Sequence, residues 1–361
     1  MAGLIQAFVK EDTVFPFLRC LCSNTPFSQF LFSEMRILIV RVSSLGDVVH
    51  NLPALADIHR HYPDAIIDWV VEEGFAGLVK QNRHVNEVIP FALRRWRKHP
   101  FSSSTRADFA AFRKRLKTEA YDWVFDTQGL LKTGIIMGFS QTVPGGKKVG
   151  LGNKTDGSSY EPVSRFFHDQ SIKMEKHIHV VQRSREMIAK ALGYTIDTPP
   201  DFGLTVSTEH YDWIPEQPYA LFFHGTSRES KKWAHPNWLR IGAMLHEKGL
   251  KILLPWGNPA EKAEAERLAV DLEDAVVLPR LSITDMSTVT GRASFVVGVD
   301  TGLSHLAAAY DKPTVQIYCN IPRWRTCCDW SPKVISLGGE NEVPALEAVE
   351  NAVRQLMVWL D

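Results

Sequence analysis

Three short segments of this sequence combine a glycine with hydroxyl, acidic or basic side chains directly after an apolar run. They are Ser43-Ser44-Leu45-Gly46-Asp47, the segment from His224-Gly225-Thr226-Ser227 to Lys231, and Asp300-Thr301-Gly302-Leu303-Ser304-His305. A glycine before a helix lets a ligand approach the backbone, and the N–H groups of a helix N-terminus attract anions. These segments therefore predict ligand contacts at the ends of buried strands.

Asp47 has two possible roles at such a position. Its carboxylate could face a cleft and act as a general base, or it could only cap the helix that follows. The two later segments indicate phosphate binding, because hydroxyls and lysines follow one strand and a helix N-terminus follows the other. The alternative for Asp300 and Thr301 is again a helix cap.

A basic run with an aromatic inside it, Arg94-Arg95-Trp96-Arg97-Lys98, follows an expected strand. The whole chain has 41 Lys and Arg against 41 Asp and Glu, so an anionic ligand must be bound by a local patch. Guanidinium groups bind carboxylate or phosphate with two hydrogen bonds. We expect this run to bind an anionic acceptor, and the alternative is a solvated surface.

The composition and the remaining motifs exclude several other classes. Apolar residues make up 45% of the chain and charged residues 23%, as in folded soluble proteins. The first strand is not followed by a G-x-G-x-x-G motif, and the 5 cysteines lack the spacing of a zinc site. His177-x-His179 is an isolated pair, so we assign no metal. A reducing compartment is expected, without export or nucleic-acid binding.

The elements that position these segments alternate along the chain. The apolar run Arg36-Ile-Leu-Ile-Val-Arg-Val42 predicts a first buried parallel strand. Further strands are expected at 66–71, 87–91, 121–126, 219–224, 250–255, 275–278, 294–299 and 313–318, and helices at 47–61, 74–81, 107–118 and 176–192. The Gly- and Lys-rich segment 141–160 is expected to be a loop.

This alternation predicts an α/β protein with two Rossmann-like halves, 35–205 and 206–361, and a ligand cleft between the carboxyl ends of their strands. Residues 1–34 lack clear periodicity and precede the first strand. We expect this N-terminal extension to be dispensable for folding and activity.

From Met35 to near its C-terminus, the sequence resembles the ADP-heptose:lipopolysaccharide heptosyltransferases. The segments that carry the resemblance are SSLGDVVHNLPAL (43–55), RRWRK (94–98), DTQGLLKT (126–133), HGTSRESKKW (224–233), LPWG (254–257) and DTGLSH (300–305). The first two favour the enzymes that add the first heptose over those that add the second.

The resemblance implies a GT-B fold, with two facing Rossmann-like domains and an interdomain cleft. It also implies inverting, metal-independent transfer of L-glycero-D-manno-heptose from ADP-heptose to the first Kdo of Kdo2-lipid A, without a cofactor. The implied protein is a cytoplasmic monomer in peripheral contact with the inner face of the inner membrane. A heptosyltransferase II-like or other nucleotide-sugar transferase, and a noncatalytic nucleotide-sugar-binding protein, remain open.

The resemblance also assigns roles to the residues above. Asp47 matches the proposed catalytic base of the family. From charge alone, we expect Lys231 and the helix N-terminus at 301–305 to stabilise the leaving diphosphate. The donor-binding positions are Thr226, Ser227, Lys231, Glu261, Asp300, Thr301, Gly302 and His305, and the acceptor-binding positions are Arg94, Arg95, Arg97 and Lys98.

Overall fold

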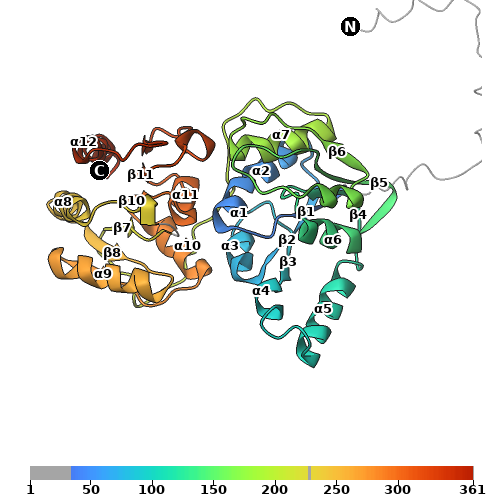
Figure 1. Ribbon diagram of the computed structural model, residues 1–361, viewed down its shortest axis with the longest axis horizontal. Helices are drawn as coiled ribbons and strands as arrows, with labels where there is room; N and C mark the ends of the chain where they lie inside the picture. The colour runs from blue at the N-terminus through green and yellow to red at the C-terminus, as the bar shows by residue number, and fades with distance from the viewer. Residues whose placement is uncertain (1–33, 227–228, 361) are drawn as a thin grey trace, which may run out of the picture. The chain divides into compact units, whose positions relative to one another are not determined.

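The computed structural model describes residues 34–226 and 229–360, which form two parallel sheets of six strands each (Figure 1). Residues 1–33, and with them nearly the whole expected extension, lie outside the described residues. The first sheet has the order β3-β2-β1-β4-β5-β6. Its strands are β1 (Arg36–Val40), β2 (Ile66–Glu72), β3 (Glu87–Phe91), β4 (Ala120–Asp126), β5 (Gln141–Leu151) and β6 (Gln170–Ile172).

Helices cover both faces of the first sheet because its central strands are apolar on both sides. Ile37 and Ile39 of β1 pack in one core, while Leu38 and Val40 pack in a second core on the opposite face. The helices that contribute to the first core are α1 (Leu45–Asn51), α2 (Pro53–His61), η1 (Glu73–Phe75), α3 (Ala76–Lys80) and α7 (Val180–Leu192). Those that contribute to the second core are α4 (Leu93–Trp96), α5 (Ser103–Arg115), α6 (Leu131–Phe139) and, at its margin, η2 (Pro162–Phe167).

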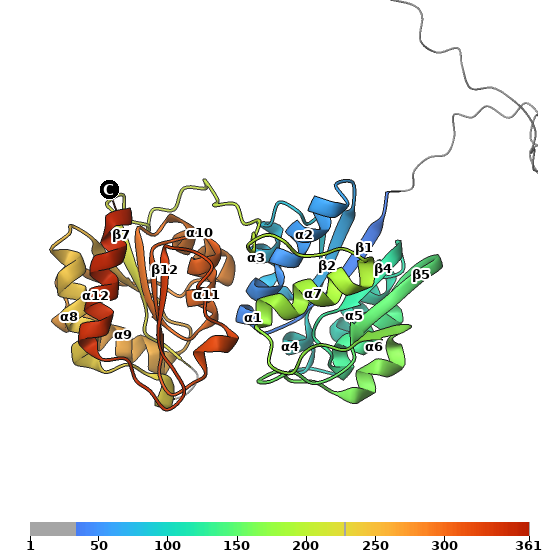
Figure 2. The same ribbon diagram turned by 90° about the horizontal axis from the view of Figure 1, so that it is seen from above.

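The second sheet repeats this plan (Figure 2). Its order β12-β11-β10-β7-β8-β9 joins β7 (Tyr219–Phe223), β8 (Lys251–Leu254), β9 (Ala275–Val277), β10 (Phe295–Val299), β11 (Thr314–Tyr318) and β12 (Val334–Gly338). One core contains α8 (His235–His246), α9 (Pro259–Asp271) and α12 (Leu346–Leu356), and the other contains α10 (Ile283–Arg292) and α11 (Gly302–Ala309). Short 3₁₀ helices are η3 (Glu229–Lys231), η4 (Arg323–Arg325) and η5 (Met357–Trp359).

Both sheets have the same Rossmann-like strand order. Counted from its own first strand, each sheet reads 3-2-1-4-5-6. The second and third strands lie on one side of the first strand and the fourth to sixth on the other, so the direction of strand addition switches between β1 and β4 and between β7 and β10. Ligands of such sheets bind outside the carboxyl ends of the strands at this reversal. The predicted α/β fold with two Rossmann-like domains is confirmed, and the division at residues 205 and 206 stays a prediction.

The prediction of a loop over 141–160 is wrong for its first part. Residues Gln141–Leu151 form β5, which pairs in parallel with β4 across a register shift between Tyr121 and Trp123. Gly145 has a φ of +86°, and a Cβ on Gly146 would lie 2.7 Å from the Tyr121 carbonyl oxygen. The glycines thus permit an irregular strand where composition suggested a loop.

Other differences are smaller. The expected helix 47–61 is divided into α1 and α2 at Pro53, because proline lacks the N–H that would continue the hydrogen bonding. The strands β6 and β12 and the helices α4, α6, α8, α9, α10 and α12 were not among the expected elements. The remaining strands lie within two residues of their expected bounds.

The two halves meet where α1 and α11 begin. A Cβ on Gly302 would lie 2.8 Å from the backbone nitrogen of Gly46, so these helices approach at backbone distance. Nearby, Gln81 accepts hydrogen bonds from Ser287 and Tyr310 of the second half. Helix α1 follows β1 and α11 follows β10, so this contact aligns the two ends at which ligands are expected.

This geometry predicts different effects for two glycine substitutions. Gly302→Ala should lower the free energy of unfolding by about 1–3 kcal/mol, because the added methyl overlaps backbone atoms that cannot move away easily. Gly46→Ala should cost less than about 1 kcal/mol, because its Cβ would meet the nearest atoms only at 3.4–3.5 Å. Urea unfolding of both variants tests this. Equal losses would show that the close approach is unimportant.

Candidate functional site

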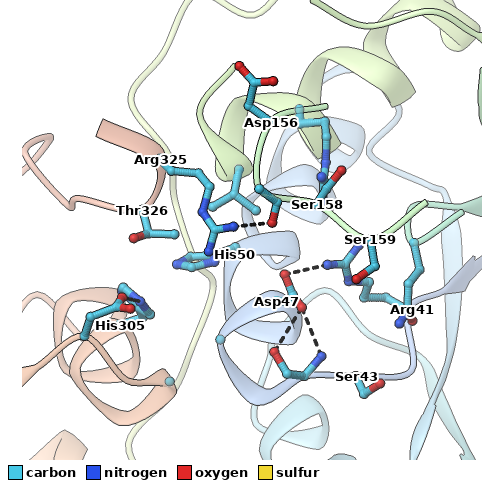
Figure 3. A pocket seen from close by; sticks show the side chains of 18 of the residues that line it. Arg41, Ser43, Asp47, His50, Asp156, Ser158, Ser159, His305, Arg325 and Thr326 are labelled. Atoms are coloured by element: carbon cyan, nitrogen blue, oxygen red, sulfur yellow. Dashed lines mark hydrogen bonds and ion pairs between the residues drawn. The ribbon is translucent and has the colours of Figure 1, made fainter. Parts of the chain in front are cut away.

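A cavity of about 550 Å³ opens at the carboxyl ends of both sheets (Figure 3). Loops after β1, β4 and β5, the start of α7, the loops after β7 and β10, and the segment around η4 contribute to its wall. Its lining includes Arg41, Ser43, Ser44, Gly46, Asp47, His50, Gln128, Lys132, Asp156, Ser158, Ser159, Arg183, Thr226, Asp300, Thr301, Gly302, His305, Arg325 and Thr326. The cavity therefore brings the first and third predicted segments together.

Asp47 lies on the first turn of α1 and points into this cavity (Figure 3). Its Oδ2 accepts hydrogen bonds from the backbone N–H and the hydroxyl of Ser44, at 3.1 and 2.9 Å. Its Oδ1 lies 2.7 Å from the guanidinium of the buried Arg41. Ser44, not Asp47, is the N-cap of α1, and Asp47 is the N3 residue that completes a capping box with it. Asp47 thus supports the start of the helix and also lines the cavity, so the capping and catalytic roles are compatible.

The charge of Asp47 is stabilised by its partners. Burial by itself would raise the pKa of the carboxyl, but the Arg41 guanidinium and the two hydrogen bonds from Ser44 outweigh burial and lower the pKa below its usual range. Asp47 is therefore ionised at neutral pH. In that form it can accept a proton from a hydroxyl held beside it.

Several basic side chains besides Arg41 line the cavity near Asp47. The Lys132 ammonium donates to the Ser43 hydroxyl at 2.9 Å, and Arg183 donates to Thr155 at 3.0 Å. Burial lowers the pKa of Arg183 to about 10, so it stays charged at neutral pH. Arg325 reaches across from the second half to the Gly157 carbonyl (Figure 3). This wall is suited to an anionic ligand.

Asp300 has two cationic or polar partners at the other side of the cavity. The Lys231 ammonium donates to its Oδ2 at 2.8 Å, and His305 Nε2 lies 3.2 Å from its Oδ1. Burial raises the pKa of Asp300, but the hydrogen bonds and charges of His305 and Lys231 hold it well below its usual range. Asp300 therefore fixes Lys231 beside the N-terminus of α11, which presents free N–H groups.

His50 and His305 connect the two sides. Their rings lie 4.4 Å apart between centroids, and each belongs to a helix of a different half. Burial and the neighbouring His305 lower the pKa of His50 well below its usual range, so its ring is neutral. A neutral ring can be buried at this contact without a charged partner.

The segment after β7 lies close to Glu261. A Cβ on Gly225 would meet the Glu261 carboxyl carbon at 2.8 Å, and Glu261 Oε2 accepts the Gly257 N–H at 2.7 Å. Thr226 lines the cavity, whereas Ser227 lies outside the described residues. Glu261 and Lys231 border this region without lining the cavity itself.

The predicted acceptor run does not line the cavity. Arg94, Arg95, Arg97 and Lys98 lie in or just after α4 and are exposed. Arg95 is paired with Glu73 at 3.1 Å and with Asp108, and the Arg94 guanidinium lies over the Phe75 ring. For Arg97 and Lys98 there is no ion-pair partner in the part of the chain that the structure describes.

Sequence reasoning missed the cavity cations Arg41, Lys132, Arg183 and Arg325. A signal existed for two of them. An arginine in the apolar strand segment 36–42 needs a buried partner, and Lys132 belongs to the quoted segment 126–133. Arg183 and Arg325 become cavity residues only through folding.

A metal centre is not apparent within residues 34–226 and 229–360, where His, Cys, Asp and Glu do not gather in groups of three or more suited to a metal ion. His177 stacks on Trp324, and His179 accepts a hydrogen bond from the Val181 N–H at the start of α7. The described helices include none that is long and apolar enough to cross a membrane.

Two Rossmann-like sheets that share one cavity at their carboxyl ends define the GT-B fold. The chain belongs to glycosyltransferase family 9, the heptosyltransferases, whose family model matches residues 109–353.

Individual relatives agree with this family. The chain is 42% identical to lipopolysaccharide heptosyltransferase 1 of Salmonella typhimurium over 287 residues, 79% of this chain and 88% of the relative. It is 41% identical to the Pseudomonas aeruginosa protein of the same name, over 79% of this chain and 78% of the relative. The structure of E. coli heptosyltransferase WaaC with ADP matches with a TM-score of 0.77 and 36% identity, over 89% of this chain and all of WaaC.

The pair of Lys231 and Asp300 generates a prediction about nucleotide binding. Lys231→Met should weaken ADP binding by on the order of tenfold or more, because it removes a cation beside the α11 N-terminus. Lys232→Met is the matched control, since Lys232 is exposed and pairs with Glu229. Calorimetry with ADP measures both. Equal affinity of the Lys231 variant and the native protein would exclude Lys231 from the site.

Proposed function

We propose that this protein transfers L-glycero-D-manno-heptose from ADP-heptose to the first Kdo of Kdo2-lipid A, with inversion, in the synthesis of the lipopolysaccharide inner core. The observation that carries the proposal is the cavity with Asp47 on one side and the Asp300 and Lys231 pair on the other. The relatives named lipopolysaccharide heptosyltransferase 1 support this reaction.

The second half is proposed to bind the donor. The diphosphate lies at the N-terminus of α11, where Thr301, Gly302 and Lys231 meet, and His305 and Asp300 hold this arrangement. Thr226 and Ser227 are proposed to contribute hydroxyls, and Glu261, which lies beside Gly225, is proposed to hold the ribose. An E. coli WaaC structure with ADP-2-deoxy-2-fluoro heptose, 36% identical with a TM-score of 0.72, supports a nucleotide-sugar site in this fold.

The chemical step is a displacement at the anomeric carbon. The Kdo oxygen forms the new bond to heptose as the bond between heptose and the ADP oxygen breaks, and ADP leaves with the electron pair. Asp47 takes the hydroxyl proton. Lys231 and the α11 N-terminus stabilise the developing diphosphate charge, which is work that a metal ion does in other phosphate-leaving reactions. We therefore propose a reaction without metal or cofactor.

The Arg41 pair affects the strength of the base. A carboxylate whose pKa is held low is a weak base, and a general base works best with a pKa near the operating pH. A second carboxylate in the cavity would oppose the field of Arg41 and raise the pKa of Asp47. The Kdo acceptor carries such carboxylates, so acceptor binding would itself strengthen the base.

The first half is proposed to bind the acceptor. Lys132 and Arg183 face the reacting Kdo, and Arg94, Arg95, Arg97 and Lys98 bind more distant acidic groups of Kdo2-lipid A. The domains are then 35–205 for the acceptor and 206–361 for the donor, with residues 1–34 dispensable. We propose a cytoplasmic monomer in peripheral contact with the inner face of the inner membrane, without a nucleic-acid partner.

Purified protein incubated with ADP-heptose and Kdo2-lipid A in EDTA tests the proposal. We expect release of ADP and a product heavier than the acceptor by one heptose. Transfer only to an acceptor that already carries one heptose would indicate a heptosyltransferase II-like enzyme. ADP-heptose binding without transfer would indicate a noncatalytic binding protein, and strict dependence on Mg²⁺ would contradict the metal-free mechanism.

Substitutions of Asp47 and of its partner Ser44 distinguish a catalytic role of Asp47 from a helix-capping role. Asp47→Asn should lower kcat by about 10² to 10⁴ with little effect on melting or ADP affinity, because asparagine can accept the Ser44 hydrogen bonds but cannot take a proton. Ser44→Ala should destabilise the protein by about 1 kcal/mol and keep most of its turnover. Near-normal turnover of Asp47→Asn would leave Asp47 as a cap alone.

For the acceptor run, Arg97→Ala with Lys98→Ala should raise the acceptor KM by on the order of tenfold, because charge-assisted hydrogen bonds to the acceptor are lost. ADP affinity should not change. Steady-state kinetics with a soluble, deacylated acceptor measure this separately from any membrane effect. An unchanged KM would identify the run as solvated surface with respect to the acceptor.

A further inference from the structure

A surface remote from the donor side of the cavity has an unusual charge. Between residues 94 and 117 there are nine Lys and Arg, namely Arg94, Arg95, Arg97, Lys98, Arg106, Arg113, Lys114, Arg115 and Lys117, and one acidic residue, Asp108. Nine positive charges less one negative charge give this segment a net +8 in a chain whose formal net charge is zero, and Glu73 and Glu87 from outside the segment pair with Arg95 and Arg115. Such a concentration attracts an anionic partner.

Helix α5 exposes part of this charge on one face. Phe112 and Leu116 on its opposite side are buried in the core under the first sheet. Arg106, Lys114 and Lys117 are exposed, and for them no ion-pair partner exists in the described part of the chain. Arg115, by contrast, pairs with Glu87. The α5 face is therefore a shallow cationic surface whose charge is not neutralised within the protein.

Exposed apolar side chains flank this cationic face. Phe101, just before α5, is 89% exposed, and Phe166 of η2 is 87% exposed. Leu131 and Ile135 of α6 and Val163 of η2 are also exposed. Together with Arg106, Lys114 and Lys117 they form what we call the basic-apolar face.

The parts of the basic-apolar face are contiguous. Phe109 of α5 packs against Phe139 of α6 with ring centroids 5.8 Å apart, and Arg113 lies over the Phe139 ring at 4.6 Å. Helix α6 in turn contacts η2, where a Cβ on Gly134 would meet Phe167. Figure 1 shows α5 beside α6 at the outer side of the first sheet. The elements that carry the basic groups and most of the apolar groups are thus in contact with one another.

The basic-apolar face also borders the cavity. Phe101 follows the carboxyl end of β3, and Leu131 follows that of β4. Leu130 and Lys132, on either side of Leu131, line the cavity. A ligand anchored at this face could therefore present a polar group to the cavity without leaving its anchor.

We propose that the basic-apolar face docks the protein on an anionic lipid bilayer, with Phe101 and Phe166 inserted at the headgroup boundary and Arg106, Lys114 and Lys117 against lipid phosphates. This assigns a surface to the membrane contact of the proposed function, and it is tested without any transfer reaction. Exposed phenylalanines and exposed basic side chains on neighbouring elements fit a membrane interface, whereas nucleic acid would use only the charge. The bilayer is therefore the favoured partner.

The test is co-sedimentation of the full-length protein with vesicles of phosphatidylethanolamine and phosphatidylglycerol, compared with phosphatidylcholine vesicles. We expect binding to the anionic vesicles that weakens with added salt. Lys114→Gln with Lys117→Gln should reduce the partition coefficient by on the order of tenfold, since each surface cation contributes to attraction. Phe101→Ser with Phe166→Ser should reduce it even at low salt.

Control variants remove exposed lysines or an exposed apolar residue outside the basic-apolar face. Lys80→Gln with Lys248→Gln removes two exposed lysines outside the face, and Val270→Ser changes an exposed apolar residue of α9. All variants should keep native ADP affinity, which reports folding. Equal vesicle binding by the face variants and the controls would overturn the proposal. Loss of binding to a labelled oligonucleotide, with vesicle binding intact, would also overturn it and favour nucleic acid.

Discussion

The close approach of two helix N-termini is the constraint on which the rest of this structure depends. Gly302 allows α11 to meet the start of α1 at backbone distance, and each helix follows a central strand of its own sheet. Because the strands of both sheets are parallel, their carboxyl ends open into the same cavity. Asp47 and Asp300 come to one cavity for this reason, although they are far apart in the sequence.

Electrostatic compensation then determines what each carboxylate can do. Lys231 and His305 both contact the Asp300 carboxylate, which holds them in position. The negative charge of Asp300 is therefore balanced by groups of the protein itself. Within the described residues, the hydrogen-bond and ion-pair partners of Asp47 are Arg41 and Ser44, and its carboxylate lines the cavity. Lys132 and Arg183 add positive charge nearby. An anionic acceptor fits this balance better than a neutral one, because it would partly neutralise these cations.

The sequence was sufficient for the fold class and for most strands, because buried parallel strands are continuous apolar runs such as 36–42. It was insufficient for β5, where paired glycines and lysines form a strand that depends on its neighbour β4. Site residues that follow strand ends, such as Asp47 and Asp300, could be found from local pattern. Arg183 and Arg325 could not, because only the packing of α7 and η4 around the cavity brings them there. The role of each site residue in catalysis stays a prediction.

The pH dependence of kcat/KM in the native protein and in Arg41→Gln tests the central claim, that ionised Asp47 is the base, most directly. Activity that needs the carboxylate is lost as pH falls through its pKa, and Arg41 lowers that pKa. We predict that the acidic limb of the profile shifts to higher pH in Arg41→Gln, in protein that still melts cooperatively and binds ADP. An acidic limb at the same pH in both proteins would contradict the account.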